Sequence, residues 1–267
     1  MDLVYPPVVA AGRLLFGALG LRLHIEGDEH IPTTGPVVIA SNHVSFLDFT
    51  LVGLMARRSH RYVRFLARHD VWNNPVSAPF MRGMRHVAVD RTVPAAAYLQ
   101  ARAMLRSGEA VGVFPEAGVS TSYTVRSLMP GAVALAAETG APLVPMAIWG
   151  PQRIFTAHQP VELRRGRPVS LLAGRPYGVP RGADVVTGTQ ALGTRLQAML
   201  DELQSRPVHQ PRPGEAPRWH PAHLGGTAPT VGQAREIETT VPRTALRPTW
   251  LPESQPDSQP NSQQSDG

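Results

Sequence analysis

Two residues close together in the chain have the types and spacing of a general base and its charge partner. His43 follows the apolar run 37–40, and Asp48 comes five residues later. In one continuous helix, five residues separate two side chains by about 140° around the axis, so the two could not face each other. With His43 in a turn and Asp48 in the first turn of a helix, the carboxylate reaches back to the imidazole. A histidine held in this way can take a proton from a hydroxyl group.

The sequence offers no nucleophile to complete a hydrolase triad. There is no cysteine, and Ser120 lies in Glu-Ala-Gly-Val-Ser rather than in a G-x-S-x-G elbow. The attacking hydroxyl could therefore belong to the substrate. It would attack an activated acyl carbonyl while His43 removes its proton and returns it to a departing thiolate. No cluster has convincing metal-ligand spacing, since the pair His220 and His223 lacks further ligands.

The elements that must position these residues alternate between strand and helix, which predicts an α/β fold with a sheet flanked by helices. Strands are predicted at 37–40, 62–66, 87–89, 111–114, 143–148 and 169–172. Helices are predicted at 47–57, 75–82, 94–107, 130–139 and 183–204. In such folds the functional groups lie on loops at strand ends.

The chain divides into three parts. Residues 1–30 form an N-terminal segment, apolar at 8–21 but interrupted by Arg13, which either docks on a membrane or packs against the domain. Residues 31–204 form the main domain. Residues 205–267 are rich in Pro, Gln, Ser and Thr, with six arginines against six acidic residues. We expect this last part to be disordered, because its few apolar residues cannot offset the entropy of ordering.

The basic charge is concentrated in one stretch. All 26 basic residues other than histidine are arginine, and residues 57–91 hold eight arginines against two aspartates, which matches the net charge of +6 of the whole chain. Such a stretch could serve a membrane surface or a phosphate-bearing ligand, or be a solvated face. The N-terminus lacks the basic region of a secretory signal, and no apolar run is long enough to span a bilayer. We therefore expect a peripheral protein on the cytoplasmic face of the cell membrane.

Four sequence blocks, in order along the chain, lie at the ends of predicted strands. They are Asn42-His43-x4-Asp48, followed by residues 83–91, 113–116 and 142–148. Together they resemble the signatures of the 1-acylglycerol-3-phosphate acyltransferase family, part of the wider glycerolipid acyltransferases. The similarity spans residues 36–149. A lone H-x4-D is common, whereas four blocks in order are specific.

The resemblance implies roles for individual residues. His43 would be the catalytic base and Asp48 its charge partner. Arg91 would bind the phosphate of the acceptor, and Glu116 would help to form the acceptor site. Pro145 would shape the acyl-binding region.

The third block departs from the family pattern, which usually reads Phe-Pro-Glu-Gly-Thr-Arg-Ser. Here residues 114–120 read Phe-Pro-Glu-Ala-Gly-Val-Ser, so Val119 stands at the arginine position and glycine is displaced to Gly118. We include Gly118 and Ser120 among the substrate-binding residues. Arg126 could supply the missing charge from a different backbone position. The departure affects the identity of the head group more than the type of reaction.

Residues and resemblance together predict an enzyme of phospholipid biosynthesis. It would transfer a fatty acyl group from acyl-CoA or acyl-carrier protein to the hydroxyl of 1-acylglycerol-3-phosphate or a related lysophospholipid, without metal, other cofactor or nucleic acid. The alternative is a non-catalytic membrane-surface or phospholipid-binding protein that kept the fold. Retention of His43 and Asp48 favours the enzyme, because a binding protein needs neither. The donor, the acyl chain length and the oligomeric state stay open at the level of sequence.

Overall fold

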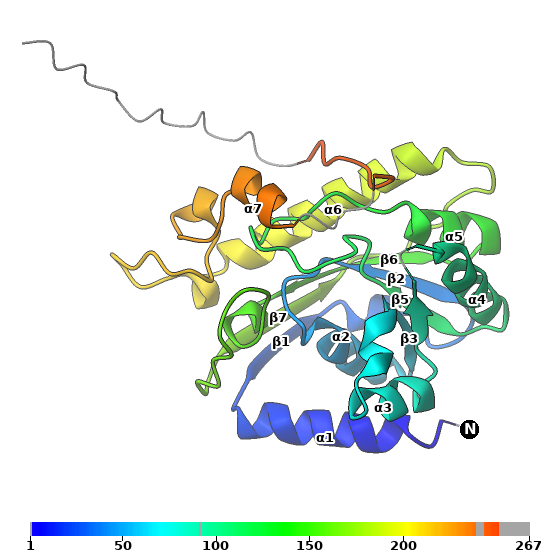
Figure 1. Ribbon diagram of the computed structural model, residues 1–267, viewed down its shortest axis with the longest axis horizontal. Coiled ribbons are helices and arrows are strands. Elements are labelled where there is room, and N and C mark those ends of the chain that lie inside the picture. Colours follow the sequence, from blue (N-terminus) through cyan, green and yellow to red (C-terminus); the bar gives the residue numbers. More distant parts are fainter. Residues whose placement is uncertain (1, 91, 239–242, 251–267) are drawn as a thin grey trace, which may run out of the picture.

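The fold is described by a computed structural model for residues 2–90, 92–238 and 243–250 (Figure 1). In this part of the chain seven strands form one sheet in the order β1-β7-β6-β2-β5-β3-β4. The strands are β1 (Arg22–Glu26), β2 (Val37–Ser41), β3 (Val63–Arg68), β4 (Val87–Val89), β5 (Ala110–Val113), β6 (Leu143–Trp149) and β7 (Pro168–Ala173). The α/β prediction is confirmed, and every predicted strand is present with its ends shifted by at most two residues.

Strand direction decides which loops meet. All neighbouring strands run parallel except β6 and β7, which are antiparallel. The carboxyl ends of β2 to β6 therefore lie at one edge of the sheet, and those of β1 and β7 lie at the opposite edge. Three of the four sequence blocks follow or include the ends of β2, β4 and β5. The topology consequently gathers these blocks on one edge, where α/β proteins commonly bind ligands.

Helices cover both faces of the sheet (Figure 1). On one face lie α4 (Pro94–Arg106), α5 (Gly131–Thr139) and α6 (Val185–Ser205), and on the other lie α1 (Tyr5–Ala18), α2 (Asp48–Ala56) and α3 (Ser77–Gly83). The short helix α7 (Val231–Ile237) lies on the α6 side of the molecule. Proline at the start of α4 costs no hydrogen bond, because the first N–H groups of a helix have no intrahelical partner.

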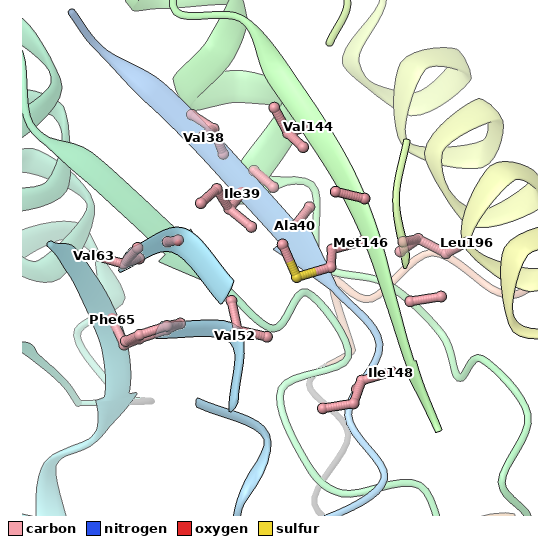
Figure 2. Close-up of a cluster of buried hydrophobic side chains, with 14 of the residues drawn as sticks. Val38, Ile39, Ala40, Val52, Val63, Phe65, Val144, Met146, Ile148 and Leu196 are labelled. Carbon is pink, nitrogen blue, oxygen red and sulfur yellow. The ribbon is translucent and has the colours of Figure 1, made fainter. Parts of the chain in front are cut away.

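The central strands are apolar throughout because they are covered on both faces. All five residues of β2 and all seven of β6 are buried. Figure 2 shows Ile39 of β2 and Met146 of β6 in a cluster that also includes Val52 of α2 and Leu196 of α6. Burying each such side chain contributes roughly 1.5–3 kcal/mol. This core holds β2 rigidly and so fixes the turn that follows it.

The N-terminal segment packs against the domain. Tyr5 and Phe16 of α1 are buried, and the Tyr5 hydroxyl donates to the carbonyl of Val63 at 2.6 Å. Leu14 and Leu15 on the same helix are exposed. In the part of the chain that is described, no helix combines the length and the apolar character needed to cross a membrane. The strand β1 that follows was not predicted, because at this edge of the sheet its apolar residues alternate with exposed polar ones.

The expectation of disorder after residue 204 must be corrected for residues 205–238 and 243–250. The Arg153 side chain stacks over the ring of Trp219 at 3.4 Å and donates to the carbonyl of His209 at 2.9 Å. Further along, Leu246 exchanges two backbone hydrogen bonds with Leu128, of 2.7 and 3.0 Å. A few widely spaced contacts hold this polar segment to the domain. The average composition of the segment gives no sign of them. Residues 239–242 and 251–267 lie outside the described residues.

Part of the basic stretch is internal. Arg64 is buried and pairs with Asp2 at 2.8 Å and with Glu109 at 2.5 Å. Arg61 is also buried and donates to three backbone carbonyls. These two guanidinium groups hold loops together instead of adding to an exposed basic face. The surface of this stretch is therefore less positive than its composition indicates.

Candidate active site

The turn that carries His43 is fixed by hydrogen bonds to two other segments. The side-chain amide of Asn42 donates to the carbonyl of Ile148 at 3.1 Å, and its oxygen accepts the N–H of Ile148 at 2.7 Å. The hydroxyl of Ser45 donates to the carbonyl of Phe155 at 2.5 Å. Asn42 thus ties the end of β2 to β6, and the turn is held on both sides of His43.

His43 and Asp48 meet as the spacing predicts, with His43 in the turn and Asp48 as the first residue of α2. The distance from His43 Nδ1 to Asp48 Oδ2 is 2.9 Å, and Oδ2 also accepts the N–H groups of Val44 and Ser45 at 2.7 and 2.8 Å. An oxygen that accepts from two N–H groups is an acceptor for the imidazole as well, so Nδ1 carries the proton. The lone pair is then on Nε2, where a base needs it.

His43 and Asp48 differ in their exposure to solvent, and this assigns them different roles. Asp48 is fully buried, whereas the side chain of His43 is 17% exposed and can reach a substrate. Burial raises the pKa of Asp48, and the hydrogen bond from His43 opposes this rise. A buried carboxylate at 2.9 Å stabilises the imidazolium that forms when His43 takes a proton. The pair therefore has the arrangement of a general base and its orienting acid.

The third sequence block packs against His43 from the neighbouring strand β5. The ring of Phe114 stacks on the imidazole with centroids 4.3 Å apart. Glu116 Oε1 accepts the N–H of His43, and the N–H of Ser120 donates to the carbonyl of His43, each at 2.7 Å. Three residues of this block thus fix the ring and the backbone of His43.

Glu116 is buried and links His43 to the following loop. Its second oxygen accepts the N–H of Arg126 at 2.9 Å. Burial raises the pKa of Glu116 to about 8, while the N–H donors of Arg126 and His43 act in the opposite direction. Both oxygens of the Glu116 carboxyl group are thus engaged with the protein's own backbone. Its predicted part in the acceptor site stays a prediction.

Arg126 lies against the third block, and its predicted part in binding the acceptor stays a prediction. Its Nη1 donates to the carbonyl of Val119 at 3.3 Å, and a Cβ atom added to Gly118 would come within 2.6 Å of the same nitrogen. A larger residue at this position would require the guanidinium to shift. The Nε atom of Arg126 lies 2.8 Å from Oε2 of Glu238, a residue of the C-terminal segment.

Of the other predicted site residues, Ser120 lies in a loop and Pro145 lies in the sheet. Ser120 is fully buried, and its hydroxyl donates to the carbonyl of Thr124 at 2.7 Å, so it shapes the loop. Pro145 is buried within β6, in register with Ala40 of β2, and lies in the sheet instead of in the turn with His43. Arg91 lies outside the described residues. In the parts of the chain that are described, no group of three or more potential metal ligands comes together.

Several residues of the site were missed at the level of sequence. Phe114 stands in a recognised block, but nothing in the sequence marks it as the partner of His43. Phe46 and Phe155 form an exposed aromatic pair with centroids 4.8 Å apart, close to the His43 turn. Glu238 bonds to Thr121 across 117 residues, and no local pattern signals such a contact.

With this geometry in place, the chain can be compared with known proteins. A family model described as acyltransferase matches residues 22–149. Residues 22–149 of the chain are therefore similar to this acyltransferase family. The matched span runs from the first residue of β1 to the last residue of β6 and contains all four sequence blocks. Glu238 lies outside it.

The chain is also similar to individual acyltransferases. The chain is 30% identical over 177 residues to 1-acyl-sn-glycerol-3-phosphate acyltransferase alpha of Mus musculus, which covers 62% of this chain and 61% of the relative. It is 29% identical over 196 residues to 1-acyl-sn-glycerol-3-phosphate acyltransferase of Bacillus subtilis, covering 69% of this chain and 92% of the relative. The chain thus spans less than two thirds of the length of the mouse protein.

A solved structure has the same fold. The crystal structure of the 1-acyl-sn-glycerophosphate acyltransferase PlsC from Thermotoga maritima superposes with a TM-score of 0.66 and 22% sequence identity. The match covers 75% of this chain and 79% of the other. The acyltransferase fold assigned from the sequence is therefore confirmed.

Proposed function

We propose that the chain is an O-acyltransferase. It transfers a fatty acyl group from an acyl thioester, carried by coenzyme A or acyl-carrier protein, to the hydroxyl of 1-acylglycerol-3-phosphate or a related lysophospholipid. The observation that carries the proposal is the hydrogen bond of 2.9 Å between His43 and the buried Asp48, with the imidazole partly exposed. The similarity of residues 22–149 to the acyltransferase family supports it.

The reaction is a direct transfer without an acyl-enzyme. His43 Nε2 takes the proton of the acceptor hydroxyl as its oxygen attacks the thioester carbonyl. The tetrahedral intermediate collapses, the C–S bond breaks, and the departing thiolate takes the proton back from the imidazolium. Asp48 stabilises the imidazolium through Nδ1 while the charge is present. Each bond formed is matched by a bond broken, and we propose that the transfer proceeds without a metal or other cofactor.

Apolar groups near His43 suit a lipid acceptor. Phe46, three residues after His43, is 43% exposed, and Phe155 beside it is 38% exposed. Large exposed aromatic side chains are unfavourable in water and favour contact with acyl chains. On the far side of the sheet from α6, the exposed Leu14 and Leu15 of α1 provide a possible contact with a membrane surface. We propose peripheral membrane association on this basis.

The alternative function is non-catalytic binding of phospholipid. It is favoured by the changed third block and by the pairing of Arg126 with Glu238, which leaves that guanidinium already neutralised. A binding protein, however, has no use for a base oriented by a buried acid. We therefore keep the enzyme as the principal proposal.

The test is a matrix of donors and acceptors with the full chain. Labelled acyl-CoA and labelled acyl-carrier protein are each incubated with 1-acylglycerol-3-phosphate, with a lysophospholipid of another head group, and with monoacylglycerol, and the lipids are separated. Label in a diacylated product supports the proposal and identifies the substrates. Absence of label from every combination, with a folded protein that binds vesicles, would establish the binding function instead.

A further inference from the structure

Both carboxylate oxygens of Glu238 are held by the loop that follows the third block. Oε1 accepts the N–H of Thr121 at 2.7 Å and its hydroxyl at 2.9 Å. Oε2 lies 2.8 Å from Nε of Arg126. The N–H and hydroxyl of Thr121 donate to one oxygen, and the guanidinium of Arg126 forms an ion pair with the other. Proteins bind phosphate and carboxylate groups with donors and cations of these kinds. The Glu238 carboxylate here takes the place of the oxygens of an anionic ligand.

The side chains of this anion site are already held in place by the protein itself. The side chains of Arg126 and Glu238 are each only 8% exposed, so the charges interact in surroundings that water screens weakly. The guanidinium is also fixed by its bond to the carbonyl of Val119. Arg126 consequently requires a negative partner at this position, from the protein or from a ligand.

The anion site is directly linked to the turn of the proposed base. Glu116 accepts the N–H of His43 with one oxygen and the N–H of Arg126 with the other. The N–H of Ser120, next to Thr121, donates to the carbonyl of His43. The loop that carries the anion site is therefore bonded to the backbone of His43 at two points, through the Glu116 side chain and the Ser120 N–H. Glu116 also holds the N–H of Arg126.

Glu238 itself belongs to a weakly anchored element. It follows the seven-residue helix α7, of which Ala234 alone among the described helix residues is buried. The neighbouring Ile237 is 43% exposed. Elements with few buried contacts open at a low free-energy cost compared with the core. The carboxylate can thus leave the site without disturbing the sheet.

We propose that Glu238 closes an anion site formed by Arg126 and Thr121, and that the phosphate of the acceptor binds there after displacing this carboxylate. The inference rests on the proposed function for the identity of the ligand. A phosphate monoester carries up to two charges and three acceptor oxygens, so it can replace the single charge of the carboxylate and satisfy the same donors. Acceptors without phosphate cannot make this exchange. The C-terminal segment then selects for phosphate-bearing acceptors.

Glu238 reduces the apparent affinity for the ligand to the intrinsic affinity multiplied by the fraction of time that the site is open. If the carboxylate is in place about nine tenths of the time, removing its charge tightens binding about tenfold. The substitution Glu238→Gln keeps the shape of the side chain and removes the charge. A matched control is Glu236→Gln, two residues earlier on α7, whose side chain is exposed.

The binding experiment uses glycerol 3-phosphate as the probe, titrated calorimetrically into the full chain and these variants. We expect Glu238→Gln to bind about tenfold more tightly than the wild type, Glu236→Gln to match the wild type, and Arg126→Gln to abolish binding. Equal or weaker binding by a folded Glu238→Gln variant would overturn the inference. Because the readout is binding, the result is independent of whether acyl transfer occurs.

A second measurement needs no substitution. Saturating glycerol 3-phosphate is expected to speed hydrogen exchange of the α7 amides in the wild type, while exchange in β2 and β6 stays slow. Unchanged exchange in α7 at saturation would refute displacement of Glu238. A displaced α7 without acyl transfer from any donor would leave the inference standing and would refute the proposed function.

Discussion

The substitution Asp48→Asn removes one charge from behind the proposed base and leaves the shape of the site intact. Asp48 Oδ2 accepts from His43, Val44 and Ser45, and the asparagine Oδ1 can occupy the same position and accept the same three donors. The amide nitrogen then takes the place of Asp48 Oδ1, which has no hydrogen-bond partner among the described residues. The imidazole keeps its orientation but loses the anion that stabilises its protonated form.

The size of the effect follows from the geometry. Two unit charges about 4 Å apart interact by about 4 kcal/mol at an effective dielectric constant of about 20. Because each 1.36 kcal/mol changes a rate tenfold, we expect kcat to fall about a thousandfold. KM should stay unchanged, since Asp48 is fully buried and cannot touch a substrate. The unpaired amide costs stability by about 1–3 kcal/mol, which a thermal melt measures separately.

The assay is acyl transfer with the best donor and acceptor of the matrix, followed at saturating substrate. Asp28→Asn is the matched control, because Asp28 also pairs with a cationic side chain, Arg58, but follows β1 at the opposite edge of the sheet. Its kcat should equal that of the wild type. A loss of less than tenfold for a folded Asp48→Asn variant would refute the role assigned to the buried carboxylate.

Three further predictions concern stability and cofactors. Ala117 has a left-handed φ of 54°, so Ala117→Gly should stabilise the fold by about 0.5–1 kcal/mol and raise Tm by about 1–4 °C in calorimetry. Burial raises the pKa of Glu116 to about 8 and lowers those of His86 and His209 to about 4 and about 3. The free energy of unfolding should therefore peak near pH 6.5. It falls at higher pH because Glu116 keeps its proton in the folded state and loses it in the unfolded state, and it falls at lower pH because the two histidines are protonated in the unfolded state but stay neutral in the folded state. A flat pH profile of stability in urea melts would contradict this. Finally, acyl transfer should be unchanged after EDTA treatment and dialysis, and a loss restored by a metal ion would overturn the cofactor-free mechanism.

Local sequence patterns were sufficient to predict the turn with His43 and the buried strands. The spacing of His43 and Asp48 admits a hydrogen bond only across a turn into a helix, and the structure has that arrangement. Strands buried on both faces are continuous apolar runs, so β2 and β6 were predicted nearly to their ends. The edge strand β1 was missed because an edge strand need not be apolar throughout.

Contacts between distant segments could not be predicted in the same way. The composition of residues 205–267 favours disorder, yet single residues such as Trp219 and Glu238 hold part of this segment to the domain. Likewise, Arg64 stands in a basic stretch but forms buried ion pairs with residues 45 and 62 positions away. Pairing across such separations depends on the folded topology, and a single sequence carries no local sign of it.

The central claim, that His43 is the base of an acyl transfer, is tested most directly by His43→Ala beside His24→Ala in the labelled-acyl assay. His24 lies exposed on the edge strand β1, so its variant controls for loss of an imidazole away from the site. The account predicts label in the diacylated product with the wild type and with His24→Ala, and a loss of at least about a hundredfold with His43→Ala. Full transfer by a folded His43→Ala protein would contradict it.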